Sequence, residues 1–414
     1  MKTISFLMFT AIVVLSAFAP GAEAQTVKTL LTFNGTESEG NLVFDSAGNL
    51  YGTTGDQYDP SLITVFQLSP NSDGSWTENV LWTATGGSDP LNIRAGVTFD
   101  ASGNLYSTSQ YGGAFGCGTV FKLTHNSNGT WSESNLVDFD CGSTGANAIG
   151  GVTFDKAGNL YGSTINGGDF GNGLIFQLTP NSDGSWIENV LHHFTGGNDG
   201  AYPDHPFLVF DASGTLYGSA ALGAQGVCPL FGSKKCGTLF KLTPQSGATW
   251  TFTVIHTFTG GTDGGNPEGT LVFDKSGNIY GTTYGGGAHG SGVAFKLIPH
   301  ANGKWGETVL HAFKAGGDGA NPLGGLIFDA SGNLFGTTAN GGQNQCFNAP
   351  GCGTVYELSP NSTGGYTEKI LVHFHGTPNA TPYNDLVMDS SGNLYGTATG
   401  YGMYASGNIY EVVR

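Results

Sequence analysis

Three short acidic segments recur within glycine-rich stretches of the chain. GGNDG, GGTDG and GGDG contain Asp199, Asp263 and Asp318. Carboxylates repeated in one kind of loop could surround a central opening and favour a cation there. Turn formation by Asp-Gly is the alternative interpretation. A second acidic pattern, D-x-x-G-N, also offers possible calcium ligands, but one carboxylate per turn is few for calcium and better fits a turn cap. We therefore expect no cofactor, with a calcium ion as the alternative.

One acid–base pair differs from these repeated features. Asp204 and His205 lie in YPDHP, which has no counterpart elsewhere in the chain. A neighbouring carboxylate and imidazole could support acid–base catalysis, so these two residues are the catalytic candidates if the protein is an enzyme. A turn at the surface is the alternative. The chain has no G-x-S-x-G, P-loop or S-x-x-K motif.

Three of the ten histidines occupy one position of a repeated segment. His192, His256 and His311 stand where other copies have Trp82 and Val137. Because residues in separate repeats cannot share one metal, this substitution pattern predicts a packing position. There is no HExxH motif or other ligand spacing.

Aromatic residues accompany Asp and Asn in the variable segments between repeats. Flat rings beside side-chain acceptors suit sugar recognition, although such rings can also pack loops together. Together with the three Asp-Gly aspartates, the candidate ligand-binding residues are Tyr58, Tyr111, Phe170, Tyr202, Phe231, Tyr284, Phe347 and Tyr383.

The elements that must position these residues come from a sevenfold internal repeat. Its clearest copies include LVFDSAGNLYGTT (42–54) and LVFDKSGNIYGTT (271–283). The shared aspartates, spaced by 55 to 63 residues, are Asp45, Asp100, Asp155, Asp211, Asp274, Asp329 and Asp389. Each copy parses into four short strands, a to d, with turn residues between them. Seven such units predict an all-β, seven-bladed β-propeller of four-stranded antiparallel blades.

The two ends of the chain predict how the ring closes. The last copy ends with GNIYEVV (407–413) and lacks strand d, whereas TVKTLLTF (26–33) matches strand d before any strand a. The N-terminal strand would complete the last blade and remove the free sheet edge. We expect a signal peptide at 1–24, with a basic start, an apolar run and Ala22-Glu23-Ala24, and a single propeller at 25–414.

Composition and charge limit the partners. With 14 basic and 31 acidic residues the net charge is −17, which disfavours nucleic acid and anionic membranes. No second long apolar run follows the leader, so we expect no membrane insertion. The predicted protein is secreted and monomeric, with an extracellular polysaccharide or a surface protein as its partner.

Six cysteines in an exported chain predict disulfide bonds. Cys228 and Cys236 share one b–c loop, and Cys346 and Cys352 share another, so we expect each pair to bridge locally. Cys141 ends a strand d that runs antiparallel to the strand c that follows Cys117. This register predicts the third bridge, 117–141.

The phrase D-x-x-GNLYGTT, a GG-rich loop, GTVFKL and a W/Y-x-E-x-x-L-x-x-F strand together resemble the GloVer repeat family. The resemblance covers essentially all of residues 26–414. It implies an exported bacterial tandem-repeat protein, often attached to the cell surface by a C-terminal anchor. No sorting tail follows the last repeat here, which favours free secretion. The family has no well-defined activity, so the resemblance implies location and architecture.

The short a–b turns repeat almost unchanged, whereas the b–c and d–a loops vary. Variable loops on a rigid scaffold usually carry binding. Because no singular feature outranks the repeated ones, we predict a non-catalytic carbohydrate-binding module that uses the b–c and d–a face. The alternatives are a polysaccharide-active hydrolase or lyase using the same face, and a structural cell-surface protein.

Overall fold

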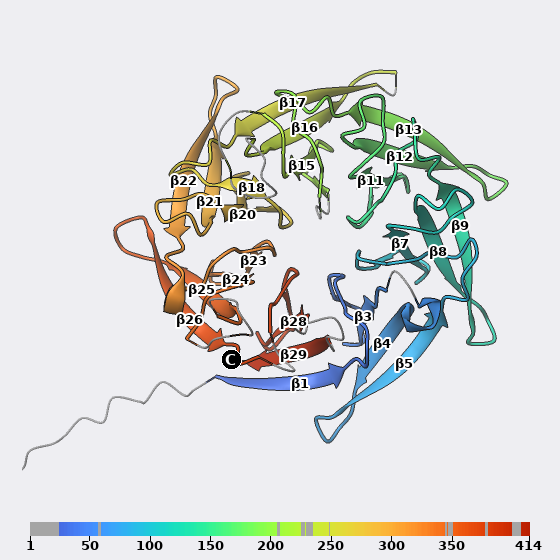
Figure 1. The fold of residues 1–414 in the computed structure, drawn as a ribbon, viewed down its shortest axis with the longest axis horizontal. Helices are drawn as coiled ribbons and strands as arrows, with labels where there is room; N and C mark the ends of the chain where they lie inside the picture. Colours follow the sequence, from blue (N-terminus) through green and yellow to red (C-terminus); the bar gives the residue numbers. More distant parts are fainter. Residues whose placement is uncertain are drawn as a thin grey trace, which may run out of the picture.

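The computed structural model describes residues 25–56, 59–204, 208–224, 228, 235–247, 249–343, 346, 351–376, 380–399 and 407–414. Within these residues the chain forms seven antiparallel sheets arranged as a ring (Figure 1), and no α-helix is present. The predicted seven-bladed propeller is confirmed. No helix in these ranges has the length and apolar character needed to cross a membrane.

Each blade runs from a two-residue inner strand a to a long outer strand d. Blade 1 comprises β2 (Val43–Phe44), β3 (Leu50–Thr53), β4 (Thr64–Pro70) and β5 (Trp76–Thr83). Blade 2 comprises β6 (Thr98–Phe99), β7 (Leu105–Ser109), β8 (Thr119–His125) and β9 (Trp131–Asp138). Blade 3 comprises β10 (Thr153–Phe154), β11 (Leu160–Thr164), β12 (Leu174–Pro180) and β13 (Trp186–His193). Blade 4 comprises β14 (Val209–Phe210), β15 (Leu216–Ala220), β16 (Thr238–Pro244) and β17 (Trp250–Thr257).

The remaining blades follow the same order. Blade 5 comprises β19 (Val272–Phe273), β20 (Ile279–Gly285), β21 (Val293–Pro299) and β22 (Trp305–Ala312). Blade 6 comprises β23 (Ile327–Phe328), β24 (Leu334–Thr338), β25 (Thr354–Pro360) and β26 (Tyr366–His373). Blade 7 comprises β27 (Val387–Met388), β28 (Leu394–Ala398), β29 (Asn408–Val413) and β1 (Thr26–Thr32). One d–a loop adds a strand, β18 (Gly265–Pro267), that pairs with β20. Two 3-10 turns, η1 (Pro60–Leu62) and η3 (Gly316–Asp318), lie in loops.

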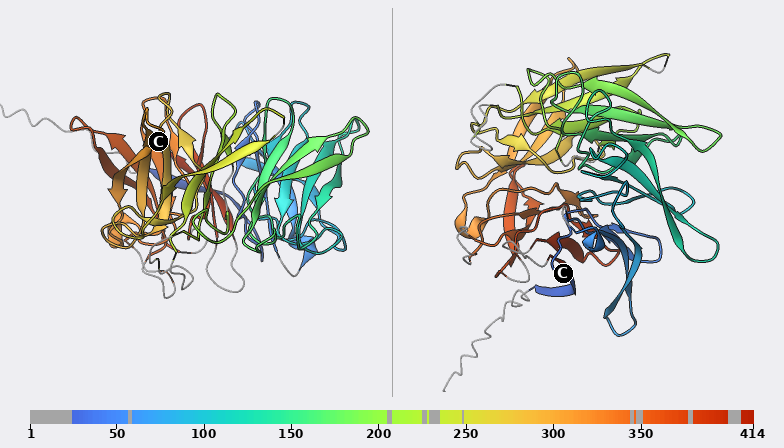
Figure 2. Two further views of the ribbon diagram at one scale, coloured as in Figure 1. Left: turned by 90° about the horizontal axis from the view of Figure 1, so that it is seen from above. Right: turned by 45° about the vertical axis from the view of Figure 1, so that its right-hand side comes forward.

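The N-terminal strand closes the ring, as the two chain ends predict. β1 lies antiparallel to β29, with Thr26 opposite Val413 and Thr32 opposite Asn408. In Figure 1 the blue first strand runs along the red last strand on the outside of blade 7. The views in Figure 2 show the ring edge-on and tilted, with loops extending from both of its faces.

The core lies between neighbouring blades. Ile175 and Phe194 of blade 3, for example, pack against Phe240 of blade 4, and all three are fully buried. The glycine of strand b makes room for the aromatic ring of strand c. A Cβ on Gly162 would lie 2.5 Å from the Phe176 ring. Six of the seven blades have this glycine, and blade 2 has the small residue Ser107 opposite Phe121 instead, so the position requires a small residue.

The repeated aspartate caps its own a–b turn. Asp155 accepts hydrogen bonds from the backbone of Ala157 (2.8 Å) and Asn159 (2.9 Å), from the Asn159 side chain (2.7 Å) and from the Tyr161 hydroxyl (3.0 Å). Burial opposes ionisation of this carboxyl, but the four donors outweigh it and lower the pKa of Asp155. The turn role that we favoured over calcium accounts for every one of these contacts.

Replacing Asp155 by Ala is expected to lower the free energy of unfolding by about 1–3 kcal/mol, because charge-assisted hydrogen bonds are lost and their donors stay unpaired. Because the pKa of Asp155 is lower in the folded state, its carboxylate stabilises the fold above the unfolded pKa of about 3.9. This stabilisation is lost as pH falls through the folded pKa. The difference from wild type should therefore shrink in acid. Chemical denaturation at pH 7 and pH 3 measures it. Asp183→Ala is the matched control, since Asp183 is exposed and accepts its hydrogen bonds from Ser185 within a c–d turn. Equal losses for both variants would contradict the assignment.

Candidate functional site

One position of the repeat lines the inner opening of the ring in five of the blades. It lies four residues before strand a of each blade, and its seven occupants all come from d–a loops: Glu39, Arg94, Ile149, His205, Glu268, Leu323 and Tyr383. His205 is outside the described residues. A narrow hollow of about 20 Å³ is lined by Glu39, Arg94, Ile149, Leu323 and Tyr383 together with residues next to them. Strand a, which follows this position, barely changes from blade to blade, whereas the residue at this position differs in chemistry.

The charged centre of this opening is an ion pair. Arg94 Nε donates to Glu39 Oε2, and Arg94 Nη2 donates to the Tyr383 hydroxyl at 3.3 Å. The guanidinium carbon lies 5.9 Å from the centre of the Tyr383 ring. Burial opposes the charge of Arg94, but attraction to Glu39, Tyr383 and Asp204 outweighs it and raises the pKa of Arg94. The loops that follow β1, β5 and β26 thus meet at one cation.

Two further acids, Asp204 and Glu268, interact with Arg94. We call the five residues the channel group: Glu39, Arg94, Asp204, Glu268 and Tyr383. Glu268 is only 4% exposed. Burial, and then the charge of Asp204, raise the pKa of Glu268 well above its usual range, although Arg94 acts in the opposite direction. Burial therefore favours the protonated form of Glu268, and in that form it can donate a hydrogen bond while Glu39 accepts one.

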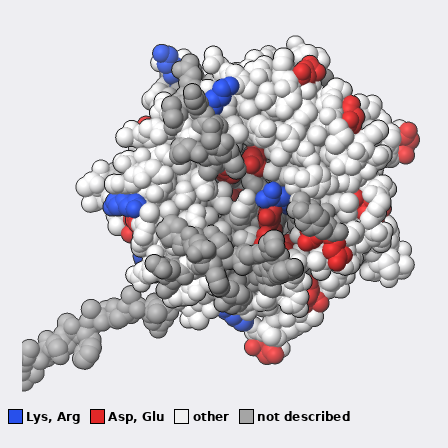
Figure 3. All heavy atoms as spheres, in the orientation of Figure 1, with Lys and Arg blue, Asp and Glu red and all other residues white. Residues whose placement is uncertain are grey.

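A second acid beside the channel group is also perturbed. Burial and the charges of Glu39 and Asp56 raise the pKa of Glu37 to about 7, against attraction to Arg94. Elsewhere in the lining, Asn41 donates to Asp385 Oδ2 at 2.7 Å and accepts from the Asp385 backbone at 3.1 Å. These hydrogen bonds join blades 7 and 1 and hold the lining in place. Figure 3 shows acidic and basic side chains gathered around the hollow at the middle of the ring.

The predicted aromatic residues are dispersed over this face. Phe170 and Tyr202 are 58% and 36% exposed, and only Tyr383 belongs to the channel group. Tyr111 and Tyr284 are half-buried, and their backbones bond to Leu91 and Asn321. Tyr58, Phe231 and Phe347 lie outside the described residues. The structure does not bring the described rings together as one platform.

Of the two interpretations of Asp199, Asp263 and Asp318, a carboxylate ring around the opening or turn formation, the contacts fit turn formation. Each carboxylate accepts from the backbone N–H at the start of its own loop: Thr195 (2.9 Å), Thr259 (2.8 Å) and Lys314 (2.7 Å), respectively. Asp199 and Asp318 also contact the outer-strand residues His192 and His311, each at 3.2 Å. Local turn hydrogen bonds therefore hold these aspartates beside the outer strands.

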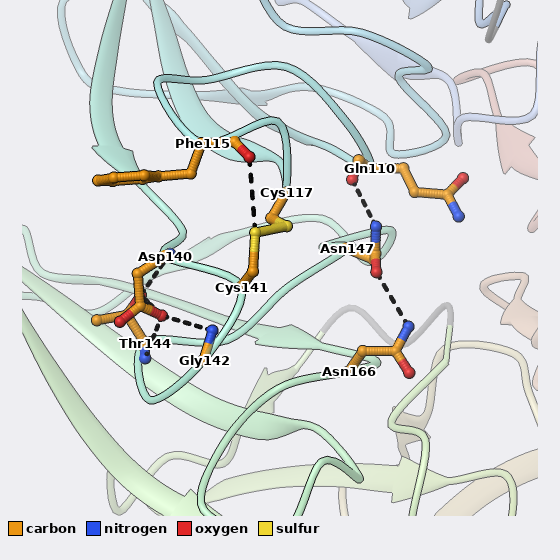
Figure 4. The surroundings of a disulfide bond; sticks show 9 residues. All are labelled: Gln110, Phe115, Cys117, Asp140, Cys141, Gly142, Thr144, Asn147 and Asn166. Atoms are coloured by element: carbon orange, nitrogen blue, oxygen red, sulfur yellow. Dashed lines mark hydrogen bonds between the residues drawn. A yellow bond between two sulfur atoms is a disulfide. The ribbon is translucent and has the colours of Figure 1, made fainter.

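All three predicted disulfides are present: Cys117–Cys141, Cys228–Cys236 and Cys346–Cys352. Figure 4 shows the first, which ties the b–c loop of blade 2 to the d–a loop that follows the same blade. Asp140 caps the adjoining turn through Gly142 (2.7 Å) and Thr144 (3.0 Å). Asn147 donates to the Gln110 carbonyl at 2.9 Å, so the d–a loop is fixed to the b–c loop from two sides.

Of the catalytic candidates, Asp204 joins the channel group through its interactions with Arg94 and Glu268. We did not single out Glu39 or Arg94 from sequence, and we left Glu268 undistinguished among the loop acids. A signal existed: the position four residues before strand a differs in chemistry from blade to blade, although strand a itself barely changes.

Known proteins resemble the chain at two levels, family and fold. The Gloeobacter/Verrucomicrobia repeat family matches residues 14–231 and 224–413, which bears out the GloVer resemblance. No curated protein matches the chain. A fungal alcohol oxidase of the AA5 family, solved with copper, is 14% identical with a TM-score of 0.53, covering 94% of this chain and 76% of its own. A Thermus thermophilus protein described as an oxidoreductase (glucose dehydrogenase) is 15% identical with a TM-score of 0.43, covering 78% and 96%. At these identities the likeness concerns the fold alone.

Proposed function

The chain belongs to the Gloeobacter/Verrucomicrobia repeat family, and on that premise we propose that it is an exported, non-catalytic propeller that binds carbohydrate or another extracellular polymer on its b–c and d–a face. The observation that carries the proposal is the channel group. Three polar side chains from different loops, Glu39, Arg94 and Tyr383, line one hollow, and the charges of Asp204 and Glu268 interact with Arg94 beside them. Polar groups that converge in a concavity characterise ligand sites.

The chemistry of the channel group favours a hydroxyl-rich ligand. Glu39 and Asp204 supply acceptors, Arg94 supplies donors, and a protonated Glu268 supplies a further donor. Tyr383 adds a flat ring and a hydroxyl. Sugar hydroxyls both donate and accept, so they can pair with every member of this set. The hollow itself, of about 20 Å³, has room for about one water molecule, so a ligand would contact the channel group from the b–c and d–a face.

Export is part of the proposal. Three disulfides indicate an oxidising compartment, because cytosolic thiols are kept reduced. The predicted leader, residues 1–24, lies outside the described residues. The net charge of −17 supports a neutral polymer over nucleic acid or another polyanion.

One observation favours an enzyme as the second candidate. Glu268 is buried with a raised pKa and interacts with Asp204, and unequal neighbouring carboxyls can serve as general acid and base. A polysaccharide-active hydrolase or lyase would use this pair on the same face.

The test is to incubate residues 25–414 with a panel of extracellular polysaccharides and to record both retention and soluble products. For a retained polysaccharide, Glu39→Gln should raise Kd by about 10-fold or more, since a hydrogen bond to a charged group is worth about 1.5–3 kcal/mol. Tyr383→Phe should raise Kd by about 2- to 10-fold, since a neutral hydrogen bond is worth about 0.5–1.5 kcal/mol. Asp73→Asn is the matched control, because this exposed residue bonds to Ser75 in a c–d turn, away from the b–c and d–a face.

The possible results separate the two candidates. Retention without products that depends on Glu39 and Tyr383 supports the binding propeller. New oligosaccharides that disappear in Glu268→Gln would replace it by the enzyme. Retention that is equal in all variants, or no retention at all, would overturn the assignment to the channel group.

A further inference from the structure

We propose that the chain has two equivalent sites for a divalent transition-metal cation such as Zn²⁺. Both sites lie outside the channel group, between the outer strands of neighbouring blades. Their residues, the cation clusters, are His256, Asp263 and Glu307 between blades 4 and 5, and His311, Asp318 and Glu368 between blades 5 and 6. In each cluster one atom from every side chain lies within 4.8 Å of the other two. An imidazole and two carboxylates are a ligand set typical of zinc, which usually leaves its fourth position to water.

Three different elements build each cluster. The histidine lies on the outer strand directly after a β-bulge. In blade 5, Phe295 of β21 pairs with Val309 of β22, but the preceding Ala294 pairs with His311, so β22 has one extra residue between them. Bulges re-aim side chains, which turns this histidine toward the next blade. The aspartate comes from the following d–a loop, and the glutamate is the third residue of the next outer strand. Residues of neighbouring blades can therefore share one ion, which we had not expected of this histidine position.

The distances are short and the side chains are mostly buried. His311 Nε2 lies 3.2 Å from Asp318 Oδ2 and 3.4 Å from Glu368 Oε1, and these three side chains are 15%, 19% and 11% exposed. His256 Nε2 lies 3.7 Å from Glu307 Oε2. Among the described residues, His256 Nε2 and Glu307 Oε1 are buried without a hydrogen-bond partner. Buried polar atoms of this kind are normally satisfied, and an ion between them would satisfy both.

The other blade interfaces provide internal controls. His192 and Asp199 repeat the first two ligands, but Phe252 replaces the glutamate and stacks on His192 at 3.6 Å. At two further interfaces Glu133 and Glu188 occupy the glutamate position, but Trp82 and Val137 occupy the histidine position. The packing role predicted for these histidines fits His192. Only the two cation clusters combine all three ligands among the described residues.

The experiment is to strip residues 25–414 with a chelator and titrate them with Zn²⁺ at pH 7.5, measuring stoichiometry by calorimetry and by metal analysis after gel filtration. Wild type should retain about two ions per chain. Glu307→Gln and His311→Ala should each retain one, and the double variant none. His192→Ala and Glu188→Gln, which alter the incomplete interfaces, should retain two. Circular dichroism would show that each variant is folded.

Several results would overturn the proposal. Wild type could retain less than one ion per chain, or Glu307→Gln and His311→Ala could bind as much Zn²⁺ as wild type. Loss of zinc in His192→Ala would place the ion elsewhere. A parallel titration with Ca²⁺ tests the metal class: calcium that binds more tightly than Zn²⁺ and ignores His311→Ala would refute the histidine-containing site. None of these results depends on carbohydrate binding.

Discussion

Deleting residues 25–33 is expected to leave a chain that aggregates instead of folding to a monomer. These residues form β1, the outer strand of blade 7, and continue to Phe33, which is 7% exposed and packs on Phe66 of blade 1. Truncating a buried Phe alone costs about 3–5 kcal/mol. The deletion also exposes the whole edge of β29, a template for intermolecular pairing. Gel filtration and thermal unfolding of the truncated chain measure the effect.

A synthetic peptide provides the control for this deletion. Residues 25–34 added in trans should restore the monomer, because β29 is the strand that β1 pairs with and the other six sheets form without β1. The same peptide carrying Val27→Asp and Phe33→Asp should fail, since both side chains pack in blade interfaces. A truncated chain with the melting temperature of the full chain would show that ring closure contributes little.

Raising the pH from 6.5 to 9 in the presence of a chelator is expected to lower stability by several kcal/mol. Burial raises the pKa of Glu307 to about 8 and that of Glu368 to about 9. A carboxyl with a raised pKa binds more protons in the folded state, so its stabilisation is present below the unfolded pKa and is lost as pH rises through the folded value. Each such group contributes up to about 1.4 kcal/mol per pH unit in that window, less the effect of solvent screening.

Below pH 6.5 the balance changes. Glu37, Glu133 and Glu188, each with its pKa raised to about 7, still favour lower pH. The lowered pKa values of His192, His256 and His311 act oppositely, because their stabilisation is lost as pH falls below about 6.5. Glu307 and Glu368 also favour lower pH in this range, so five acids oppose these three histidines. Stability should therefore still rise, but less steeply, as pH falls from 6.5 to about 5, and it should fall in acid, where the capping aspartates are protonated.

Denaturant unfolding of wild type and of the double variant Glu307→Gln, Glu368→Gln across this range checks the prediction. The variant should lose most of the decline above pH 6.5, because its amides do not ionise. Glu78→Gln is the control, since the pKa of Glu78 is raised by burial without a neighbouring acid. An identical alkaline decline in wild type and the double variant would contradict the assignment.

The architecture follows from patterns that are local in the sequence. Alternating apolar residues and an Asp-capped turn recur in each unit and specify four strands, and in six of the seven units a strand-b Gly, such as Gly162 opposite Phe176, makes room for the ring of strand c. The unmatched strands at the two ends predict closure through β1 and β29. The disulfides could be paired for the same reason: once strand register is known, antiparallel neighbours such as the ends of β8 and β9 must meet.

Only the tertiary structure decided which loop residues meet. In the channel group, Arg94 meets Glu39 from 55 residues away and Tyr383 from 289 residues away, and the curvature of the ring, which no repeat encodes by itself, brings them together. The same curvature places Glu307 beside His256 across a blade interface. The sequence identified Asp263 as a candidate, but a hydrogen bond to Thr259 holds its carboxylate at the outer strand. Repeats determine strands and register locally; the contacts between repeats arise from packing, and packing determined both candidate sites.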